Sequence, residues 1–440
     1  MASHSIDMYL ESLKEVFSRP VTFTLLRKDY SHVEPYTRTP GYIYSIEDSS
    51  VQAKDTIIEI SWILKMMRAP HPQIDAADCA KHLHELAMTL GDLGMHTEAL
   101  SILSWTVTLY REMYRDQPGV FAPYLARSLH FIGLYRLKLG QYSATVVAST
   151  EAATLYRQAY AAATEDDLAA DLGMALKIRS CGLRRIGQAR REEALRVCGE
   201  AVSIFRELVR SREDFTIELA MVLGTQARHF HDAGLSDKAF EYGQEAVDIL
   251  SAKVDEAHDN PSAQIQLAGA LFSHAFHLWK AGRSLDCLEV NEKAIMLWRL
   301  LYAARPKAWR LKFCDALNHQ ASYHYSIGQH DDALRLSQEA LDLMRGVVTT
   351  TMECNMFAGI LETPALVFEA MGRFEDALHA VEEIVCTIYN FPAFQSRNAQ
   401  LAKALRWAAK LLRALQRDPE AQLREEEAAL LDVEPDGKIA

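Results

Sequence analysis

The sequence predicts an all-α protein, a right-handed α-solenoid built from antiparallel helical hairpins. One pattern of apolar and small residues recurs eight times along the 440 residues, at intervals of 44–49 residues. Within each repeat the pattern advances in steps of three, four and seven, which is the periodicity of one helix face. The chain has only thirteen prolines and twenty glycines, and this favours helices over turn-rich β structure.

The first 50 residues do not carry this pattern. Residues 5–18 have apolar positions at helical spacing, so a short amphipathic helix is predicted there, and Pro20 ends it. The prolines and tyrosines between Pro20 and residue 50 indicate an irregular segment that packs its tyrosines on the next helices. We therefore expect an N-terminal cap over 1–50, a solenoid over 51–431 and a flexible tail over 432–440.

Residues 52–68 fit the pattern as a second helix without its first-helix partner. Ala53, Ile60 and Leu64 are in register with the later repeats, 46 residues ahead of Ala99. Prolines in the stretch 34–50 exclude a regular helix there, so the helix at 5–18 is the candidate substitute.

The first half of each repeat has a fixed order of residue types. An apolar residue is followed by a small one, three residues later comes leucine, and four residues after that a second small residue. The leucines are Leu83, Leu129, Leu176, Leu223, Leu271, Leu317, Leu361 and Leu405. Seven residues after the second small residue stands a glycine in seven of the eight repeats, as expected where a helix ends in a left-handed residue.

The second half repeats as well. It carries two small residues seven positions apart, such as Thr145 and Ala152, then a large residue four positions later, such as Tyr156. Arginine follows the large residue in five repeats: Arg111, Arg157, Arg206, Arg299 and Arg345. Small residues let two antiparallel helices approach closely, and a single hairpin cannot bury its own apolar face. Each repeat therefore needs its neighbour, which predicts a continuous stack.

This alternation of small and large residues resembles the tetratricopeptide repeat (TPR), in which small residues stand where Gly133 and Ala152 stand here. The resemblance covers about residues 76–431. It departs from the 34-residue family pattern in its longer period and in having leucine where tryptophan is typical. The tripeptide Leu-Tyr-Arg occurs at 109–111 and at 155–157. In this the sequence is similar to the long-period TPR arrays of mushroom-forming fungi, which often follow a nucleotide-binding module. The chain contains no GxxxxGK[ST] motif.

Composition excludes several function classes. A net charge of −12 argues against general affinity for nucleic acid, which relies on phosphate neutralisation by lysine and arginine. No secretory signal is visible at the start, and no run approaches the roughly 18 apolar residues that span a bilayer. Seven scattered cysteines, never spaced as CxxC, indicate reduced cytosolic thiols, mostly buried, rather than a metal site.

The resemblance to TPR stacks implies a concave groove lined by the first helices. The residues expected to face it form a basic stretch, then an aromatic wall. The groove-binding candidates are His84, Arg127, His130, Lys177, Arg184, Arg228, His231, Phe272, Phe276, Trp279 and Tyr325. Our hypothesis is that the arginines and Lys177 meet carboxylates of a peptide while the aromatic residues hold its apolar anchor. The alternative is that these are ordinary solvated charges and packing aromatics.

No catalytic, cofactor or metal signature accompanies the repeats. Histidines occur in close pairs, but none forms HExxH, and no nucleophile can be paired with His231 and its neighbour Asp232. We therefore predict a non-catalytic cytosolic scaffold or adaptor that binds a protein or peptide. A ligand- or peptide-responsive sensor and a helical-repeat enzyme are the alternatives. Self-association is also open, because an incomplete first repeat leaves apolar surface to cover.

Overall fold

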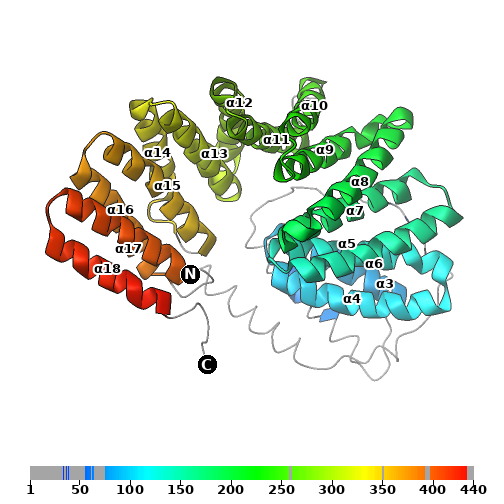
Figure 1. The fold of residues 1–440 in the computed structure, drawn as a ribbon. Coiled ribbons are helices and arrows are strands. Elements are labelled where there is room, and N and C mark those ends of the chain that lie inside the picture. Colours follow the sequence, from blue (N-terminus) through cyan, green and yellow to red (C-terminus); the bar gives the residue numbers. More distant parts are fainter. Residues whose placement is uncertain are drawn as a thin grey trace. The chain divides into compact units, whose positions relative to one another are not determined.

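The computed structural model describes residues 33, 36, 38, 55–60, 62–63, 75–256, 260–348, 351–391 and 397–433. The chain forms two compact units, an N-terminal unit over Met1–Ser262 and a C-terminal unit over Ala263–Ala440. Consecutive helices pack on one another within each unit (Figure 1). The predicted all-α solenoid of antiparallel hairpins is confirmed.

The N-terminal unit contains the first four hairpins. Its helices are α3 (Ala76–Asp92), α4 (His96–Asp116), α5 (Pro118–Lys138), α6 (Tyr142–Ala162), α7 (Asp166–Ile186), α8 (Arg191–Ser211), α9 (Thr216–Asp232) and α10 (Ser236–Glu256). Two short 3-10 turns, η2 (Gln188–Arg190) and η3 (Glu213–Phe215), precede α8 and α9. The third repeat has two extra residues in its turn, since Ala194 follows Gly187 by seven positions whereas Thr145 follows Gly140 by five. The turn η2 accommodates these two residues. Ahead of α3, residues 55–60 and 62–63 are helical, within the range predicted for the orphan helix; Ala53 and Leu64 lie outside the described residues.

The C-terminal unit contains the last four hairpins. They are α11 (Pro261–Lys280), α12 (Ser284–Ala304), α13 (Pro306–Ser326), α14 (His330–Met344), α15 (Thr351–Ala370), α16 (Phe374–Tyr389), α17 (Arg397–Ala414) and α18 (Asp418–Val433). Proline opens α5, α11 and α13, where its missing N–H costs nothing and its fixed φ suits the first helical turn. The helix predicted over 5–18 lies outside the described residues.

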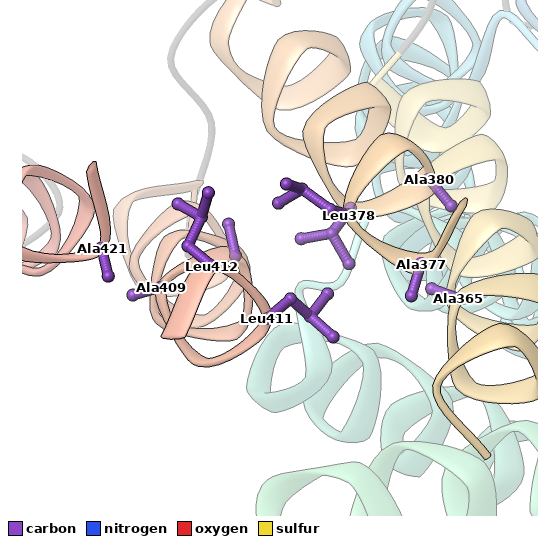
Figure 2. Close-up of a cluster of buried hydrophobic side chains, with 10 residues drawn as sticks. Ala365, Ala377, Leu378, Ala380, Ala409, Leu411, Leu412 and Ala421 are labelled. Carbon is purple, nitrogen blue, oxygen red and sulfur yellow. The ribbon is translucent and has the colours of Figure 1, made fainter. Parts of the chain in front are cut away.

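The repeated small residues form the contact between the helices of each hairpin. Ala227 and Ala365, for example, occupy the same register position in the two units, and both are fully buried. In the C-terminal unit, alanines of α15–α18 bring the helices together while Leu378, Leu411 and Leu412 fill the space between them (Figure 2). Packing of this kind tolerates little added volume, which explains why the small positions recur.

The hairpin turns share one hydrogen-bond pattern. In seven of the eight described hairpins, the residue after the turn residue donates its N–H to a carbonyl five positions back, at 2.8–2.9 Å, as Gln141 does to Arg136. This 6→1 bond is the Schellman motif, which needs a left-handed turn residue. Glycine supplies that residue with φ of 72–82° in six of them, whereas in the last hairpin Gln416 adopts φ 61°. The third hairpin, with its longer loop, instead has Gly187 at φ 145°.

Four of the five arginines that follow the large residue of a second helix pair with the next repeat, whereas Arg345 pairs with Asp342 of its own repeat. In each pair the arginine directly after the large residue meets the glutamate directly before the small residue of the following second helix. The pairs are Arg111–Glu151 at 2.8 Å, Arg157–Glu200 at 2.5 Å, Arg206–Glu245 at 2.7 Å and Arg299–Glu339 at 2.8 Å. We call these pairs the arginine ladder.

The equivalent positions of α10 and α12 are occupied by Ser251 and Lys293, which cannot form such a pair. This change in residue type coincides with the boundary between the two units. Among the described helices, none combines the length and apolar character needed to cross a bilayer.

Candidate functional site

Three consecutive first helices of the N-terminal unit present a row of side chains on one face. Each of these side chains belongs to the residue two positions before the first small residue of its repeat. The three residues are Tyr124 on α5, Asp171 on α7 and Glu218 on α9. Equivalent positions in successive repeats point the same way, because each hairpin repeats the geometry of the one before. We call Tyr124, Asp171 and Glu218 the first-helix row.

The row holds two residues from the N-terminal segment of the same chain. The hydroxyl of Tyr36 donates a hydrogen bond to Asp171 Oδ2, and its ring meets Tyr124 edge-on at 5.3 Å between centroids. Arg38 donates from Nε to Asp171 Oδ1 and from Nη2 to Glu218 Oε1, both at 3.0 Å. Tyr36 therefore bridges α5 and α7, and Arg38 bridges α7 and α9. The predicted packing of the segment's tyrosines on the helices is thus observed at Tyr36.

Burial strengthens this contact. The side chains of Arg38, Asp171 and Glu218 are only 10%, 15% and 16% exposed. Burial raises the pKa of Asp171, and the charge of Arg38 together with the Tyr36 hydrogen bond opposes that rise. Burial also acts to lower the pKa of Arg38, but the two carboxylates outweigh it and raise that pKa. Arg38 therefore favours the charged form of Asp171, and the carboxylates favour the charged form of Arg38, while burial opposes both charges.

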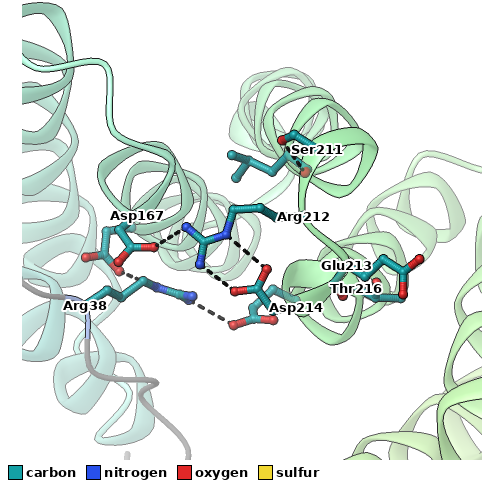
Figure 3. A network of polar contacts seen from close by, with 10 residues as sticks. Arg38, Asp167, Ser211, Arg212, Glu213, Asp214 and Thr216 are labelled. Atoms are coloured by element: carbon teal, nitrogen blue, oxygen red, sulfur yellow. Dashed lines mark hydrogen bonds and ion pairs between the residues drawn. The ribbon is translucent and has the colours of Figure 1, made fainter. Parts of the chain in front are cut away.

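A second arginine contributes to the same region. Arg212, between α8 and η3, pairs with Asp167 at 3.0 Å and with Asp214 at 2.6 Å (Figure 3). The guanidinium carbons of Arg212 and Arg38 lie 4.5 Å and 5.3 Å from the centre of the buried Phe215 ring. This ring therefore carries cations from two segments distant in sequence, an arrangement worth about 0.5–2 kcal/mol per contact.

Three of the predicted basic residues lie beside the row. Lys177 is 8% exposed, and burial, reinforced by Arg228, lowers its pKa. Burial lowers the pKa of His130 to about 3, with Lys177, Arg38 and Arg127 adding to the effect. Arg127, which is half-buried, donates to Met88 Sδ at 3.8 Å. At neutral pH His130 is therefore uncharged, and the cations beside the row are the half-buried Arg127 and the buried Lys177.

The other predicted charged residues of this unit differ in exposure. Arg184 forms an ion pair with Asp232 at 2.8 Å between Nη1 and Oδ2, so an arginine engages the carboxylate next to His231. His231 is half-buried at the end of α9. Arg228 is exposed and donates to Thr225 Oγ1 at 3.3 Å.

His84 lies in the helix packing. It is 5% exposed, and its Nδ1 is 3.0 Å from Ser128 Oγ of the next first helix. Because that hydroxyl also donates to the carbonyl of Tyr124, Nδ1 of His84 must be the donor. His84 therefore joins α3 to α5 and presents little surface to a ligand.

The same arrangement links α7 to α9. His229 Nε2 lies 3.0 Å from Ser180 Oγ, and the hydroxyl of Ser180 donates to the carbonyl of Lys177. Burial, together with Arg184 and Arg228, lowers the pKa of His229 to about 3. Both histidines are therefore neutral interhelical donors.

In the C-terminal unit the predicted aromatic residues gather around a histidine that the sequence did not single out for the groove. Phe272 and Phe276 meet the His319 ring at 4.8 and 6.2 Å between centroids. Trp279 lies 5.5 Å from Tyr323 by the same measure. We call Phe272, Phe276, Trp279, His319 and Tyr323 the aromatic cluster.

The surroundings of the aromatic cluster are polar. The ammonium of Lys280 stands 4.4 Å above the Trp279 ring. Burial acts to lower the pKa of His319, but hydrogen bonding to Asp315 and the charge of that carboxylate raise it. The predicted Tyr325 is not part of this group and instead contacts His330.

A cavity of about 520 Å³ lies next to the first-helix row. The ends of α4 and α6 and the starts of α5 and α7 form its walls, with Val33 and Tyr36 on one side. Most of the lining is apolar, and the polar side chains at it are Tyr114, Gln158 and Glu165.

Sequence reasoning missed the first-helix row, although a signal was present. The position two residues before the first small residue is acidic in three of the first four repeats, at Asp78, Asp171 and Glu218. For Tyr36 and Arg38 no signal was available, because the segment that carries them has no repeat register.

No protein-family model matches the sequence, and no curated protein matches it. Solved structures do. The apo form of the quorum sensor NprR from B. thuringiensis superposes with a TM-score of 0.51 at 13% identity, covering 86% of this chain and 94% of that one. Aspartyl phosphate phosphatase F from Bacillus subtilis superposes with a TM-score of 0.49 at 14% identity, covering 90% of this chain and 97% of that one. BtubC from P. vanneervenii superposes with a TM-score of 0.46 at 15% identity, covering 57% of this chain and 96% of that one.

These neighbours are TPR-like repeat proteins, and at such low identity the likeness concerns the fold. The predicted TPR-like architecture agrees with it. The similarity to fungal arrays stays a prediction.

Proposed function

We propose that the protein is a non-catalytic cytosolic scaffold that binds a protein or peptide on the first-helix face of its N-terminal unit. One observation carries the proposal. The first-helix row already holds Tyr36 and Arg38 of the chain itself, through one tyrosine hydroxyl, two ion pairs and an aromatic contact. A face that holds two residues of a non-repeat segment in this way has the chemistry to hold those of a partner.

The titratable groups of this face support binding rather than acid–base chemistry. The pKa of His130 is lowered to about 3, far below the range in which a general base works best at neutral pH. Lys177 and His84 are buried in the packing between helices. The row is acidic and holds an arginine, so it favours a partner that presents a cation. The acidic partner of the sequence hypothesis is a separate alternative, for which Arg228 is an exposed cation.

The test is selection of random 12-residue peptides displayed on phage against the full chain. We expect enriched peptides whose binding falls at least about tenfold in Asp171→Asn/Glu218→Gln, since these changes remove both negative charges. Glu207→Gln is the matched control, because Glu207 is an exposed residue of α8 that pairs only locally with Arg210. Peptides that bind Asp171→Asn/Glu218→Gln and the wild type equally would mean that recognition occurs at another surface, which would contradict the proposal.

A ligand-responsive sensor is the second candidate, and the cavity beside Val33 and Tyr36 favours it. Its volume is that of a small-molecule site, and its lining is mostly apolar. A small apolar compound that binds only the folded chain would raise the melting temperature. No shift across a fragment library at millimolar concentration would remove this candidate.

A further inference from the structure

We propose that Tyr36 and Arg38 occupy the partner's own site, and that the partner presents an aromatic residue followed two positions later by arginine. This inference rests on the proposed function and gives the chemistry of the peptide. It also makes the N-terminal segment an internal competitor of the partner.

The spacing of the two residues matches the spacing of the repeats. Tyr36 bridges α5 and α7, whereas Arg38 bridges α7 and α9, so two residues along the segment correspond to one repeat along the stack. In an extended peptide, residues two apart face the same side and lie roughly 7 Å from each other. An aromatic residue that also donates a hydrogen bond, as tyrosine does, followed two positions later by a cation reproduces both bridges.

The charge of the row requires a cation. Asp171 and Glu218 point at Arg38 from two helices, and both side chains are largely buried. Without a guanidinium between them, two carboxylates would share a poorly solvated place. Arginine can donate to both carboxylates at once from a planar fork, which lysine cannot do with the same geometry. An acidic peptide would add a third negative charge.

The cavity adds an apolar position to the expected peptide. Val33 lines it three residues before Tyr36. This valine borders the cavity of about 520 Å³ and does not fill it. A partner with a larger apolar residue three positions before its aromatic residue would fill more of the cavity and gain about 25 cal/mol for each Å² of apolar surface removed from water.

Tyr36 and Arg38 are suited to exchange because they contact the row through their side chains, whereas the helices that receive them are held by their own core. The three residues of the row stand on separate hairpins whose small residues are buried. The site is therefore formed by the repeats and does not need the segment for its shape. A tethered competitor lowers the apparent affinity of a free peptide by the fraction of time for which it leaves the site open.

The direct test uses a fluorescein-labelled peptide with the sequence of residues 31–40 (SHVEPYTRTP) and the full-length chain. We expect it to bind Tyr36→Ala/Arg38→Ala at least about tenfold more tightly than the wild type, as measured by fluorescence anisotropy. That ratio corresponds to a segment that is docked for about nine tenths of the time. Equal affinity for both chains, or no binding to the variant at millimolar peptide, would overturn the proposal.

Three controls address charge and folding. The same peptide with glutamate in place of its arginine should not bind, and a preference for that acidic peptide would overturn the charge assignment. Adding Asp171→Asn/Glu218→Gln to the Tyr36→Ala/Arg38→Ala variant should abolish peptide binding. Adding Glu207→Gln to the same variant should leave peptide binding unchanged. Where the double alanine variant melts early, Tyr36→Phe/Arg38→Gln keeps most of the side-chain volume and gives the same comparison.

The two proposals can fail separately. Displayed peptides that depend on Asp171 and Glu218 but lack the aromatic-x-arginine pattern would leave the binding function standing and remove this inference. Peptides that ignore both residues would remove the binding function itself.

Discussion

The N-terminal and C-terminal units use one scaffold to present two different kinds of first-helix face. In the N-terminal unit the face carries buried ionic groups, with Asp171 and Glu218 around Arg38. In the C-terminal unit the first helices α11 and α13 bring Phe272, Phe276 and His319 together instead. The residues that hold each hairpin closed are the same in kind, small and buried in both units. Packing therefore determines the repeated positions, and the positions beside them are left to differ.

The largest effect should come from filling a small position, and it should be the same in both units. Ala227→Leu and Ala365→Leu each add three carbons at an equivalent, fully buried position. Overpacking of this kind should cost about 3 kcal/mol in the free energy of unfolding, as measured by urea denaturation. Ala304→Leu, at an exposed position on α12, is the control and should change little. A small cost in one unit alone would mean that the two cores are not built alike.

Acid should affect the two units in opposite directions through their histidines. His229 has a folded-state pKa of about 3, below its unfolded value near 6.5, so the unfolded chain takes up the proton first and stability falls as pH drops below 6.5. Between pH 6.5 and 5 this one group should cost about 2 kcal/mol, and His229→Gln should remove that loss. His319 has a raised pKa, so its contribution is present below 6.5 and is lost as pH rises through the folded value. Denaturant unfolding of the wild type, His229→Gln and His319→Gln between pH 5 and 8 checks both signs. The difference in unfolding free energy between wild type and variant should rise with pH for His229 and fall with pH for His319, and two differences that change in the same direction would contradict the contrast.

The hairpin turns should show an effect of about 1 kcal/mol, again with opposite signs. Gln416 holds a left-handed φ of 61° that glycine adopts without strain, so Gln416→Gly should stabilise the C-terminal unit. Gly234 has φ 76° in the N-terminal unit, so Gly234→Ala should destabilise it by a similar amount. Melting temperatures measured by circular dichroism would decide, and a loss in Gln416→Gly would show that its side chain contributes more than its backbone strain costs.

The smallest effect should come from the arginine ladder. The side chains of Arg157 and Glu200 are 43% and 39% exposed, so water and salt screen most of their attraction. Arg157→Ala should cost at most about 0.5 kcal/mol, and 0.5 M salt should reduce that cost further. The same change at Arg299 tests the C-terminal unit, where the pair with Glu339 is similarly open. A cost above 2 kcal/mol in either unit would mean that the ladder does more than align neighbouring second helices.

Comparison of the predicted and observed site shows where sequence reasoning reached its limit. Counting TPR positions predicted that His84 and Lys177 face the groove, but both side chains are buried, and that of His84 is engaged by Ser128 of the next first helix. The aromatic residues 272, 276 and 279 do gather, since they share one face of a helix. The tyrosine that Trp279 meets is the fully buried Tyr323, two positions before the predicted Tyr325 and therefore on another face of the helix, and Tyr325 stays a prediction for the groove.

The sequence by itself determined the scaffold: the eight hairpins, their buried small residues and their left-handed turns. These follow from local periodicity, since each repeat carries the same spacing and each contact is made with the next element along the chain. Only the tertiary structure decided what the first helices hold. Tyr36 and Arg38 lie 135 and 133 residues before Asp171, in a segment without periodicity, and nothing local connects them. Contacts of such separation depend on which charges remain to be satisfied after the repeats have packed.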